Sequence, residues 1–212
     1  MIGPSDVPPQ FAQFNRDFIV GGEGLSMLVL EGGEVSETHA EFKRSGLNPR
    51  PIFTFERKAR QPDGSVGQVG FDLVFADLPR ATRAGFFTCS QTRPDLFWKT
   101  EYQSHANGAV GLHIVNMDAG DPGAVADFLG RFTGCAPRKR GHAYVFDTPR
   151  GRIEVGPGPA QPNFSRYVIK TNDLNGIRYH ARDAKIPFWE TSLALEISAD
   201  FMHGVTVGFV QA

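Results

Sequence analysis

The sequence predicts an α+β fold made of repeated units in the order strand, helix, strand, strand, strand. This order occurs three times along the chain, in copies of about 50 to 70 residues, and an internal repeat is a stronger guide to the fold than any single element. Within each copy the apolar spacing changes from the alternation of a strand to the spacing of an amphipathic helix. Each copy forms a half-sheet, which needs a partner to cover it.

The composition is that of an ordinary globular protein with many aromatic core residues. Hydrophobic residues make up 41% of the 212 residues, and 18 residues are Phe. The 22 basic and 23 acidic side chains nearly cancel and form no basic run, so we expect neither a nucleic-acid nor a membrane partner. Residues 1–10 lack the features of a signal peptide, which favours a cytoplasmic protein. Cys89 and Cys135 lack CxxC spacing, so we expect two free thiols.

Residues 1–24 are predicted to form an N-terminal arm with one short helix. Phe11, Phe14 and Phe18 follow the i, i+3, i+7 spacing of one helix face. A Pro-Pro pair begins this pattern and a Gly-Gly pair ends it, which are the usual residues at helix boundaries.

The first unit spans residues 25–91. Its expected elements are a strand at 25–30, a helix at about 34–45, and strands at 51–58, 66–75 and 85–91. Gly46 ends the helix, and residues 61–64 (Gln-Pro-Asp-Gly) form a turn between strands. Residues 92–109 follow as a connecting arm, which we expect to dock through the run from Leu96 to Trp98 because it is too aromatic for a free linker.

The second unit begins at residue 110. We expect a strand at 110–117, a helix at 121–133, a short strand near 138, and strands at 142–147 and 151–156. Asp121 suits the N-cap of the helix, Pro122 its first turn and Gly134 its end. The apolar face of the helix follows i, i+3, i+4, i+7 spacing at Val125, Phe128, Leu129 and Phe132.

His113 and Glu154 are the polar residues that stand out in these strands. Alternation places Leu112 and Ile114 with Asn116 on one face of the first strand, and His113 on the opposite face. If the strand at 151–156 returns beside the strand at 110–117, Glu154 could meet His113 in the concavity of the sheet.

The third unit follows a Gly- and Pro-rich segment at 156–162. We expect a strand at 166–171, a helix that begins near 173, and strands near 188–191, 193–197 and 205–210. The apolar face of this helix carries Leu174, Ile177, Ala181 and Ala184.

This βαβββ repeat resembles the vicinal oxygen chelate superfamily. That superfamily includes glyoxalase I, extradiol dioxygenases, methylmalonyl-CoA epimerase, and the fosfomycin- and bleomycin-resistance proteins. The run from Phe86 to Ala109 is similar to bacterial glyoxalase-like proteins with two paired-unit halves. The resemblance implies curved, cup-shaped mixed sheets with the helices outside. It also implies that residues 110–212 pair two units within the chain, whereas residues 25–91 have no partner unit in it.

The resemblance implies a metal site at the centre of the 110–212 cup. In this superfamily the ligands come from the first and last strands of each unit, and a divalent ion there acts as a Lewis acid on two adjacent substrate oxygens. His113 and Glu154 match these positions as metal ligands, with Glu154 also as the catalytic base. Such ligands suit Zn, Mn, Fe or Ni. Gly208 stands where the pattern often has Glu, which departs from a complete site.

Three further residues are candidates for ligand binding. His142 could supplement the metal ligands from a neighbouring strand. Tyr167 is the one potential donor on the first strand of the third unit, and Trp189 beside Phe188 could line a ligand pocket.

Two functions follow from this interpretation. The first is a glyoxalase-like protein that holds a small polar organic substrate through a divalent metal, with isomerase, lyase or dioxygenase chemistry. The second is a metal-free protein that binds or sequesters a small molecule, or a dimeric scaffold without catalysis, and Gly208 favours it. In both cases the uncovered apolar face of residues 25–91 predicts a homodimer through this unit.

Overall fold

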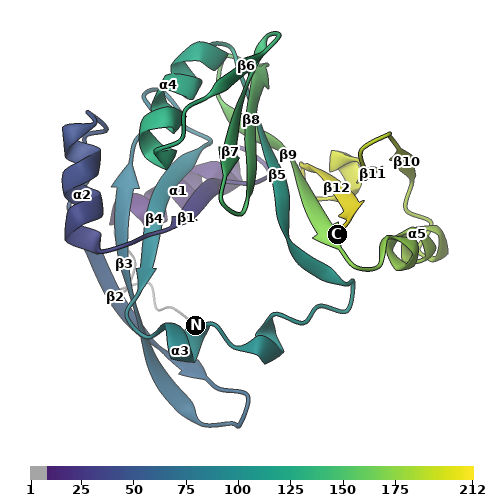
Figure 1. Ribbon diagram of the computed structural model, residues 1–212, viewed down its shortest axis with the longest axis horizontal. Coiled ribbons are helices and arrows are strands. Elements are labelled where there is room, and N and C mark those ends of the chain that lie inside the picture. The colour runs from purple at the N-terminus through teal and green to yellow at the C-terminus, as the bar shows by residue number, and fades with distance from the viewer. Residues whose placement is uncertain (1–8) are drawn as a thin grey trace.

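The computed structural model describes residues 9–212, and residues 1–8 of the predicted N-terminal arm lie outside the described residues. The described chain forms two curved mixed sheets with five α-helices (Figure 1). The four-stranded sheet has the order β1-β4-β3-β2, and the eight-stranded sheet has the order β10-β11-β12-β9-β5-β8-β7-β6. The predicted α+β class, with repeated βαβββ units in curved sheets, is confirmed.

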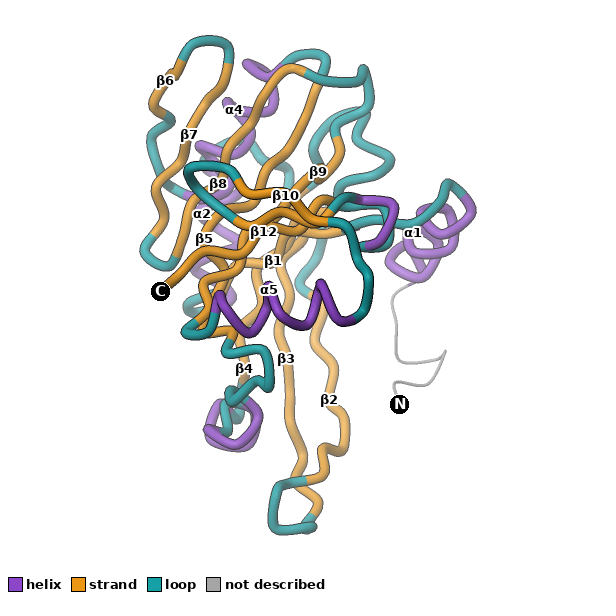
Figure 2. The backbone as a smooth tube through the Cα atoms, turned by 90° about the vertical axis from the view of Figure 1, so that its right-hand side faces the viewer, coloured by secondary structure: helices purple, strands orange, loops and turns teal. Residues whose placement is uncertain are grey.

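The four-stranded sheet belongs to the first unit. Its strands are β1 (Met27–Glu31), β2 (Phe53–Arg60), β3 (Val66–Ala76) and β4 (Gly85–Gln91). Helix α1 (Pro9–Val20) precedes the sheet, α2 (Val35–Arg44) follows β1, and α3 (Pro94–Phe97) begins the connecting arm. The long β2–β3 hairpin extends away from the eight-stranded sheet (Figure 2).

The eight-stranded sheet contains the second and third units. The second unit consists of β5 (Ala109–Ala119), α4 (Pro122–Thr133), β6 (Arg138–Arg140), β7 (Ala143–Thr148) and β8 (Gly151–Pro157). The third consists of β9 (Asn163–Thr171), α5 (Leu174–Asp183), β10 (Phe188–Glu190), β11 (Leu195–Ile197) and β12 (Thr206–Gln211). Two short 3₁₀ turns complete the described elements, at Thr100–Tyr102 and Ala199–Phe201.

All three units share one internal topology. The first strand of each unit lies parallel to the last, in the pairs β1–β4, β5–β8 and β9–β12, and the remaining pairs are antiparallel. The second and third units join through their first strands, since β5 pairs antiparallel with β9. The equivalent strand of the first unit, β1, is an edge strand of its sheet.

Helix α4 forms as its sequence predicts. The Asp121 carboxylate accepts a hydrogen bond from Ala124 N at 3.0 Å, which caps the first turn, and Pro122 occupies a position where no backbone donor is needed. Gly134 ends the helix with a φ of 69°, in the left-handed region that favours glycine. These caps fix the length of the helix and therefore the position of its apolar face.

The largest core lies between the two sheets and contains helices α2 and α4. Phe86 of β4 packs edge to face against Phe128 of α4, with 4.8 Å between ring centroids, and Phe42 of α2 lies 5.5 Å from Phe132 of α4. Met117 and Val155 add the helix-covered face of the eight-stranded sheet to the same core, and both are fully buried. This shared core holds the first and second units together.

Each sheet has a second apolar cluster of its own. A cluster beneath α5 contains Ile177, Leu195 and Phe209. On the opposite side of the four-stranded sheet from α2, a cluster rich in Phe is centred on Phe71 and packs against Leu96, Phe97 and other rings. The predicted docking of the connecting arm is therefore confirmed for Leu96 and Phe97. Trp98 lies against Phe97 but is 47% exposed.

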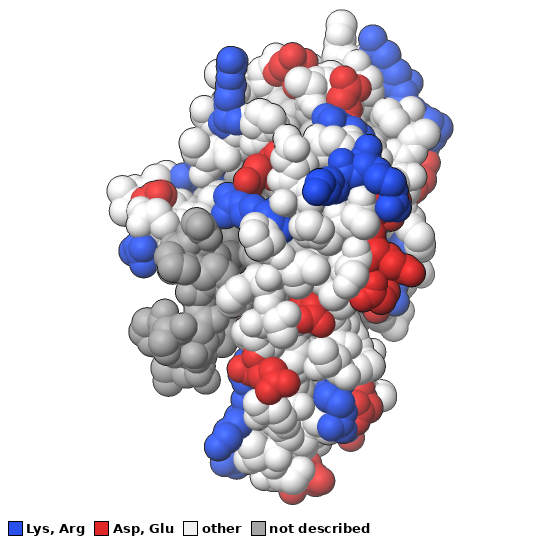
Figure 3. All heavy atoms as spheres, turned by 90° about the vertical axis from the view of Figure 1, so that its left-hand side faces the viewer, with Lys and Arg blue, Asp and Glu red and all other residues white. Residues whose placement is uncertain are grey.

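The surface carries both charge signs. On the face shown in Figure 3, basic and acidic side chains are interspersed, as expected from a net charge of −1. Among the helices formed by residues 9–212, none has the length and apolar character needed to cross a membrane.

Candidate functional site

The candidate site lies on the face of the eight-stranded sheet opposite α4 and α5, which we call the cup face. In the strand ladder Asn116 of β5 stands between Glu154 of β8 and Arg166 of β9, and directly opposed residues point to the same side of a sheet. Glu196 of β11 is opposed to Gly208 of β12 on the same side. The alternate residues of these strands, such as Met117 and Val155, point into the core.

A continuous polar network joins these side chains. Arg166 donates from Nε and Nη2 to the two carboxylate oxygens of Glu196, at 3.1 and 2.5 Å, and from Nη1 to Asn116 Oδ1 at 2.9 Å. Asn116 in turn donates from Nδ2 to Glu154 Oε2 at 3.2 Å. The network therefore runs Glu154–Asn116–Arg166–Glu196, with the guanidinium between the two carboxylates.

The ion pair between Arg166 and Glu196 is largely removed from water. The side chain of Glu196 is 5% exposed and that of Arg166 is 24% exposed. Burial of a carboxylate is costly without a paired cation, and removal of one partner from such a pair typically costs about 3–5 kcal/mol. Loss of either Glu196 or Arg166 would therefore leave the other with an unpaired charge in the sheet.

A second group of charges extends from Glu154 towards β6. Arg152 lies 3.7 Å from Glu154 and donates from Nε to Asp147 at 2.9 Å, while Arg138 donates to the other oxygen of Asp147. The hydrogen bonds from Arg138 and then Arg152 lower the pKa of Asp147 from its usual range. Lys170 lies on the same side of β9 as Arg166, and Asp118 lies on the same side of β5 as Asn116, so the cup face carries charges of both signs.

Gly208 leaves the space that the ion pair occupies. A Cβ atom at this position would lie 3.1 Å from Glu196 Oε2 and 3.3 Å from Arg166 Nη2, which is closer than ordinary contact. The third unit therefore places a carboxylate on the cup face from β11 and not from β12. A Glu at 208 would compete for the volume that Glu196 and Arg166 already fill.

His113 lies at a β-bulge that strict alternation does not anticipate. The β5–β9 register shifts between Leu112 and Ile114, so His113 is the extra residue of β5. Counting residues along the strand therefore does not predict on which face of the sheet His113 lies relative to Ile114. The pKa of His113 is lowered mainly by burial and then by the cations Lys170 and Arg152, with Glu154 opposing and Arg166 adding to the effect. The charges of the cup face and burial thus both favour the neutral form of its imidazole.

The donors on the cup face do not fit a resident divalent metal. Within residues 9–212 no group of three or more His, Cys, Asp or Glu side chains is placed to hold an ion. Both oxygens of Glu196 are bound by Arg166, and Glu154 takes its hydrogen bond from Asn116, with no such bond to His113. The guanidinium already supplies the positive charge between these carboxylates, so a metal would displace it at the cost of the buried pair.

The other three candidate residues lie in different surroundings. His142 is exposed in the turn before β7. Tyr167 points to the helix-covered side, where it packs against the cluster beneath α5. Trp189 of β10 is opposed to Glu196 and is 45% exposed, so of the three it is the one that the structure brings beside the network.

Arg166, Glu196 and Asn116 form the network but were not singled out as functional by sequence. One signal was present: Glu196 is flanked by Leu195 and Ile197, and a lone carboxylate in a buried strand requires a cation. The identity of that cation depends on strand order, which the sequence pattern does not provide.

The fold and the network define a glyoxalase-like protein whose paired units carry a charge network on their common sheet. The family model described as "Glyoxalase-like domain" matches residues 2–133. The chain belongs to this glyoxalase-like domain family, which confirms the resemblance inferred from the sequence. A search of curated proteins gives no match.

Two solved structures illustrate the likeness in fold. A hypothetical protein from Staphylococcus aureus superposes with a TM-score of 0.66 at 10% identity, over 94% of this chain and 71% of that chain. Methylmalonyl-CoA epimerase from Mycobacterium tuberculosis superposes with a TM-score of 0.42 at 12% identity, over 53% of this chain and 95% of the epimerase. The first of these supports the fold alone.

Substitution of Gly208 tests whether the ion pair fills the cup face. We expect Gly208→Glu to lower the free energy of unfolding by about 2–4 kcal/mol, because it adds volume and a second carboxylate beside Glu196. Gly111→Ala on β5 is the matched control, since a Cβ there meets no atom within 4 Å. Urea unfolding measures both. A Gly208→Glu protein as stable as wild type would contradict the described packing.

Titration of His113 tests the charge environment of the bulge. By NMR we expect a pKa below the usual value of about 6.5. Lys170→Gln removes a cation that disfavours the imidazolium, so it should raise this pKa, whereas Glu154→Gln removes the opposing anion and should lower it further. Shifts of the same sign in the two variants would show that His113 does not sense these groups.

Proposed function

We propose that the protein binds a small polar organic molecule on the cup face without a resident divalent metal. The observation that carries the proposal is the buried Arg166–Glu196 pair, whose guanidinium lies between Glu196 and the Asn116–Glu154 pair. In a metal-dependent site a divalent cation would organise the carboxylates. Here the guanidinium of Arg166 does so, through its hydrogen bonds to Glu196 and Asn116.

Two cations of the cup face, Lys170 and Arg152, favour an anionic ligand. Lys170 of β9 is opposed to Gly111 of β5, and Arg152 of β8 is opposed to Ile114 of β5, so the two cations lie on the strands that flank His113. Cationic side chains bind carboxylates through charge-assisted hydrogen bonds. A small hydroxy or oxo acid could place its carboxylate on Lys170 or Arg152 and its neighbouring oxygen on His113.

Proton transfer is a second candidate function, favoured by the lowered pKa of His113. A neutral imidazole can accept a proton from a carbon beside a carboxylate, and the imidazolium that results can return the proton to a neighbouring atom of the substrate. Nearby cations stabilise the negative charge that develops in between. The corresponding reaction class is isomerisation. In this function His113 is the base. Glu154, which contacts Asn116 and Arg152, helps to position these two side chains.

We also propose that a second copy of the chain covers the first unit. Two features support a homodimer through residues 25–91. The edge strand β1 is the counterpart of β5 and β9, which pair antiparallel with each other. Val29 of β1 is 46% exposed on the side opposite Leu28 and Leu30, which pack into the shared core. An antiparallel β1–β1 pair across a two-fold axis would repeat the antiparallel pairing of β5 with β9. It would also bury the side of β1 that carries Val29.

Binding of lactate tests the proposed function. By calorimetry in EDTA we expect lactate to bind and its neutral analogue lactamide to bind at least tenfold more weakly. Lys170→Gln should weaken lactate binding about tenfold, or about 1.4 kcal/mol, while Lys43→Gln on exposed α2 should not. Binding that disappears in EDTA and returns with Zn²⁺ or Mn²⁺ would contradict the metal-free proposal. Absence of binding by lactate, oxalate and succinate would contradict an organic-acid ligand.

The sedimentation mass tests the homodimer. We expect twice the 23.2 kDa of the chain for wild type, and a single-chain mass for Val29→Asp, because a charge in the joint would be desolvated. Val29→Thr is the control that keeps the shape of the side chain without a charge. A wild-type mass of one chain at micromolar concentration would contradict the dimer.

A further inference from the structure

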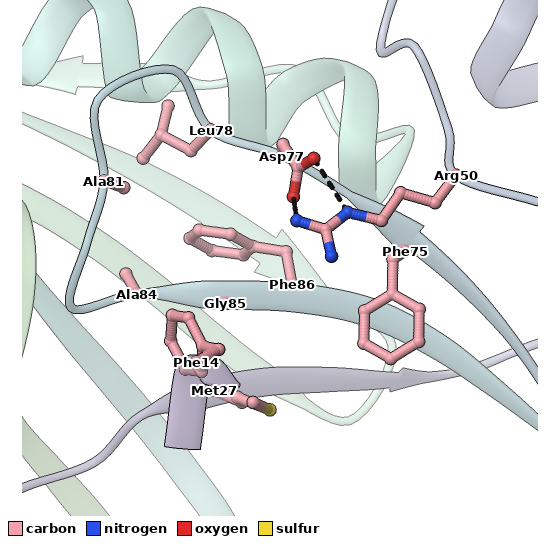
Figure 4. Close-up of a pocket in the computed structure, with 10 residues that line it drawn as sticks. All are labelled: Phe14, Met27, Arg50, Phe75, Asp77, Leu78, Ala81, Ala84, Gly85 and Phe86. Carbon is pink, nitrogen blue, oxygen red and sulfur yellow. Dashed lines mark hydrogen bonds and ion pairs between the residues drawn. The ribbon is translucent and has the colours of Figure 1, made fainter. Parts of the chain in front are cut away.

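A cavity of about 190 Å³ lies in the first unit, where β3 ends and β4 begins (Figure 4). Its walls come from α1, β1, β3, β4, Arg50 before β2 and the loop at 77–84, and none of its lining residues belongs to the eight-stranded sheet. The cavity is therefore separate in sequence and in sheet from the cup face. Neither the proposed function nor the family likeness gives it a role.

The cavity wall combines apolar side chains with polar groups at one end. The rings of Phe14, Phe75 and Phe86 and the side chain of Met27 line it, and Phe86 is 1% exposed. Small residues create the space: a Cβ at Gly85 would lie 3.1 Å from Met27 Cγ and 3.4 Å from Phe14 Cζ. The cavity is thus framed by side chains that are held in a packed core.

The helix that contributes Phe14 is anchored from outside the cavity. The guanidinium of Arg83 stacks on the ring of Phe18 at 4.3 Å and donates to the backbone oxygens of Phe18 and Glu23, at 3.3 and 3.2 Å. These contacts hold α1 against the 77–84 loop. Phe14 is therefore a stable wall of the cavity.

One end of the cavity is charged. Arg50 donates from Nε and Nη2 to the two oxygens of Asp77, both at 2.9 Å, and its backbone N–H donates to Phe75 O at 3.1 Å. In Figure 4 the remaining nitrogen, Nη1, points away from Asp77 towards Phe75 and Phe86. The Arg50 and Asp77 side chains are 40% and 58% exposed, so this end opens to solvent.

We infer that this cavity is a second ligand site, for a molecule of single-ring size that carries one carboxylate. A cavity of about 150 Å³ can hold benzene, so a volume of 190 Å³ is sufficient for one ring with a small polar substituent at the charged end. The ring would lie among Phe14, Phe75 and Met27. The carboxylate would accept hydrogen bonds from Arg50 Nη1, the guanidinium edge that Asp77 leaves open.

The negative charge of Asp77 opposes the positive charge of Arg50 in the binding of an anion. Asp77 orients the guanidinium and also repels an incoming anion. Removal of this charge should strengthen carboxylate binding, whereas removal of the Arg50 charge should weaken it. A site that merely tolerated apolar molecules would respond to neither change.

Benzoate is the probe, with binding followed by calorimetry and by the NMR resonance of the Met27 methyl group. For wild type we expect saturable binding that shifts this resonance, with benzamide weaker than benzoate. Arg50→Gln should weaken benzoate at least tenfold, and Asp77→Asn should strengthen it about threefold or more. Arg93→Gln is the matched control, because Arg93 forms a similar exposed bidentate pair with Asp95; it should leave binding unchanged.

A filling variant completes the test. Ala84→Leu places a larger side chain at a position that is 4% exposed and lines the cavity, and it should abolish binding of benzoate and benzamide alike. Because Asp77→Asn is expected to act in the opposite direction, general loss of folding cannot produce the full pattern. The proposal is overturned if wild type shows no saturable benzoate binding, if Arg50→Gln binds equally well, or if the Met27 methyl resonance does not respond.

Discussion

The pairing of Glu196 with Arg166 is the constraint on which the cup face depends. A carboxylate that is 5% exposed is costly to bury without a nearby cation, and the guanidinium donates hydrogen bonds to both of its oxygens. The other features follow from this pair. Gly208 must lack a side chain so that the pair has room, and Asn116 uses its two ends to connect the guanidinium to Glu154. The result is a polar centre organised by the guanidinium of Arg166.

The three units share a topology but differ in chemistry. The second and third units pair through β5 and β9, and their common sheet presents charges on one side. The first unit presents phenylalanine rings on the corresponding side and keeps β1 at the edge of its sheet. A single core between the sheets, with Phe86 against Phe128, holds these different surfaces in one molecule. The repeated topology therefore determines the backbone of each unit. The side chains that face away from the helices determine what each unit can bind.

Local sequence was a good guide wherever a local rule governs the structure. The Asp121 cap, the Gly134 end of α4 and the helix face at Phe128 follow from residues close together in the chain. His113 is different, because its direction was inferred from strict alternation. A bulge interrupts that alternation, and a bulge arises from the pairing of two strands, β5 and β9, which the sequence of either strand alone does not specify.

The sequence by itself determined the units, their helices and the family resemblance, because periodicity and caps are properties of neighbouring residues. It also identified Glu154 and the unusual Gly208. Only the tertiary structure decided how these residues act. It placed Glu196 of β11 and Arg166 of β9 around Gly208, although they lie 30 residues apart in the chain. Strand order and packing, which are long-range consequences of burying apolar faces, thereby paired Glu196 with Arg166 and bonded Glu154 to Asn116. The role of His113 and Glu154 as metal ligands stays a prediction.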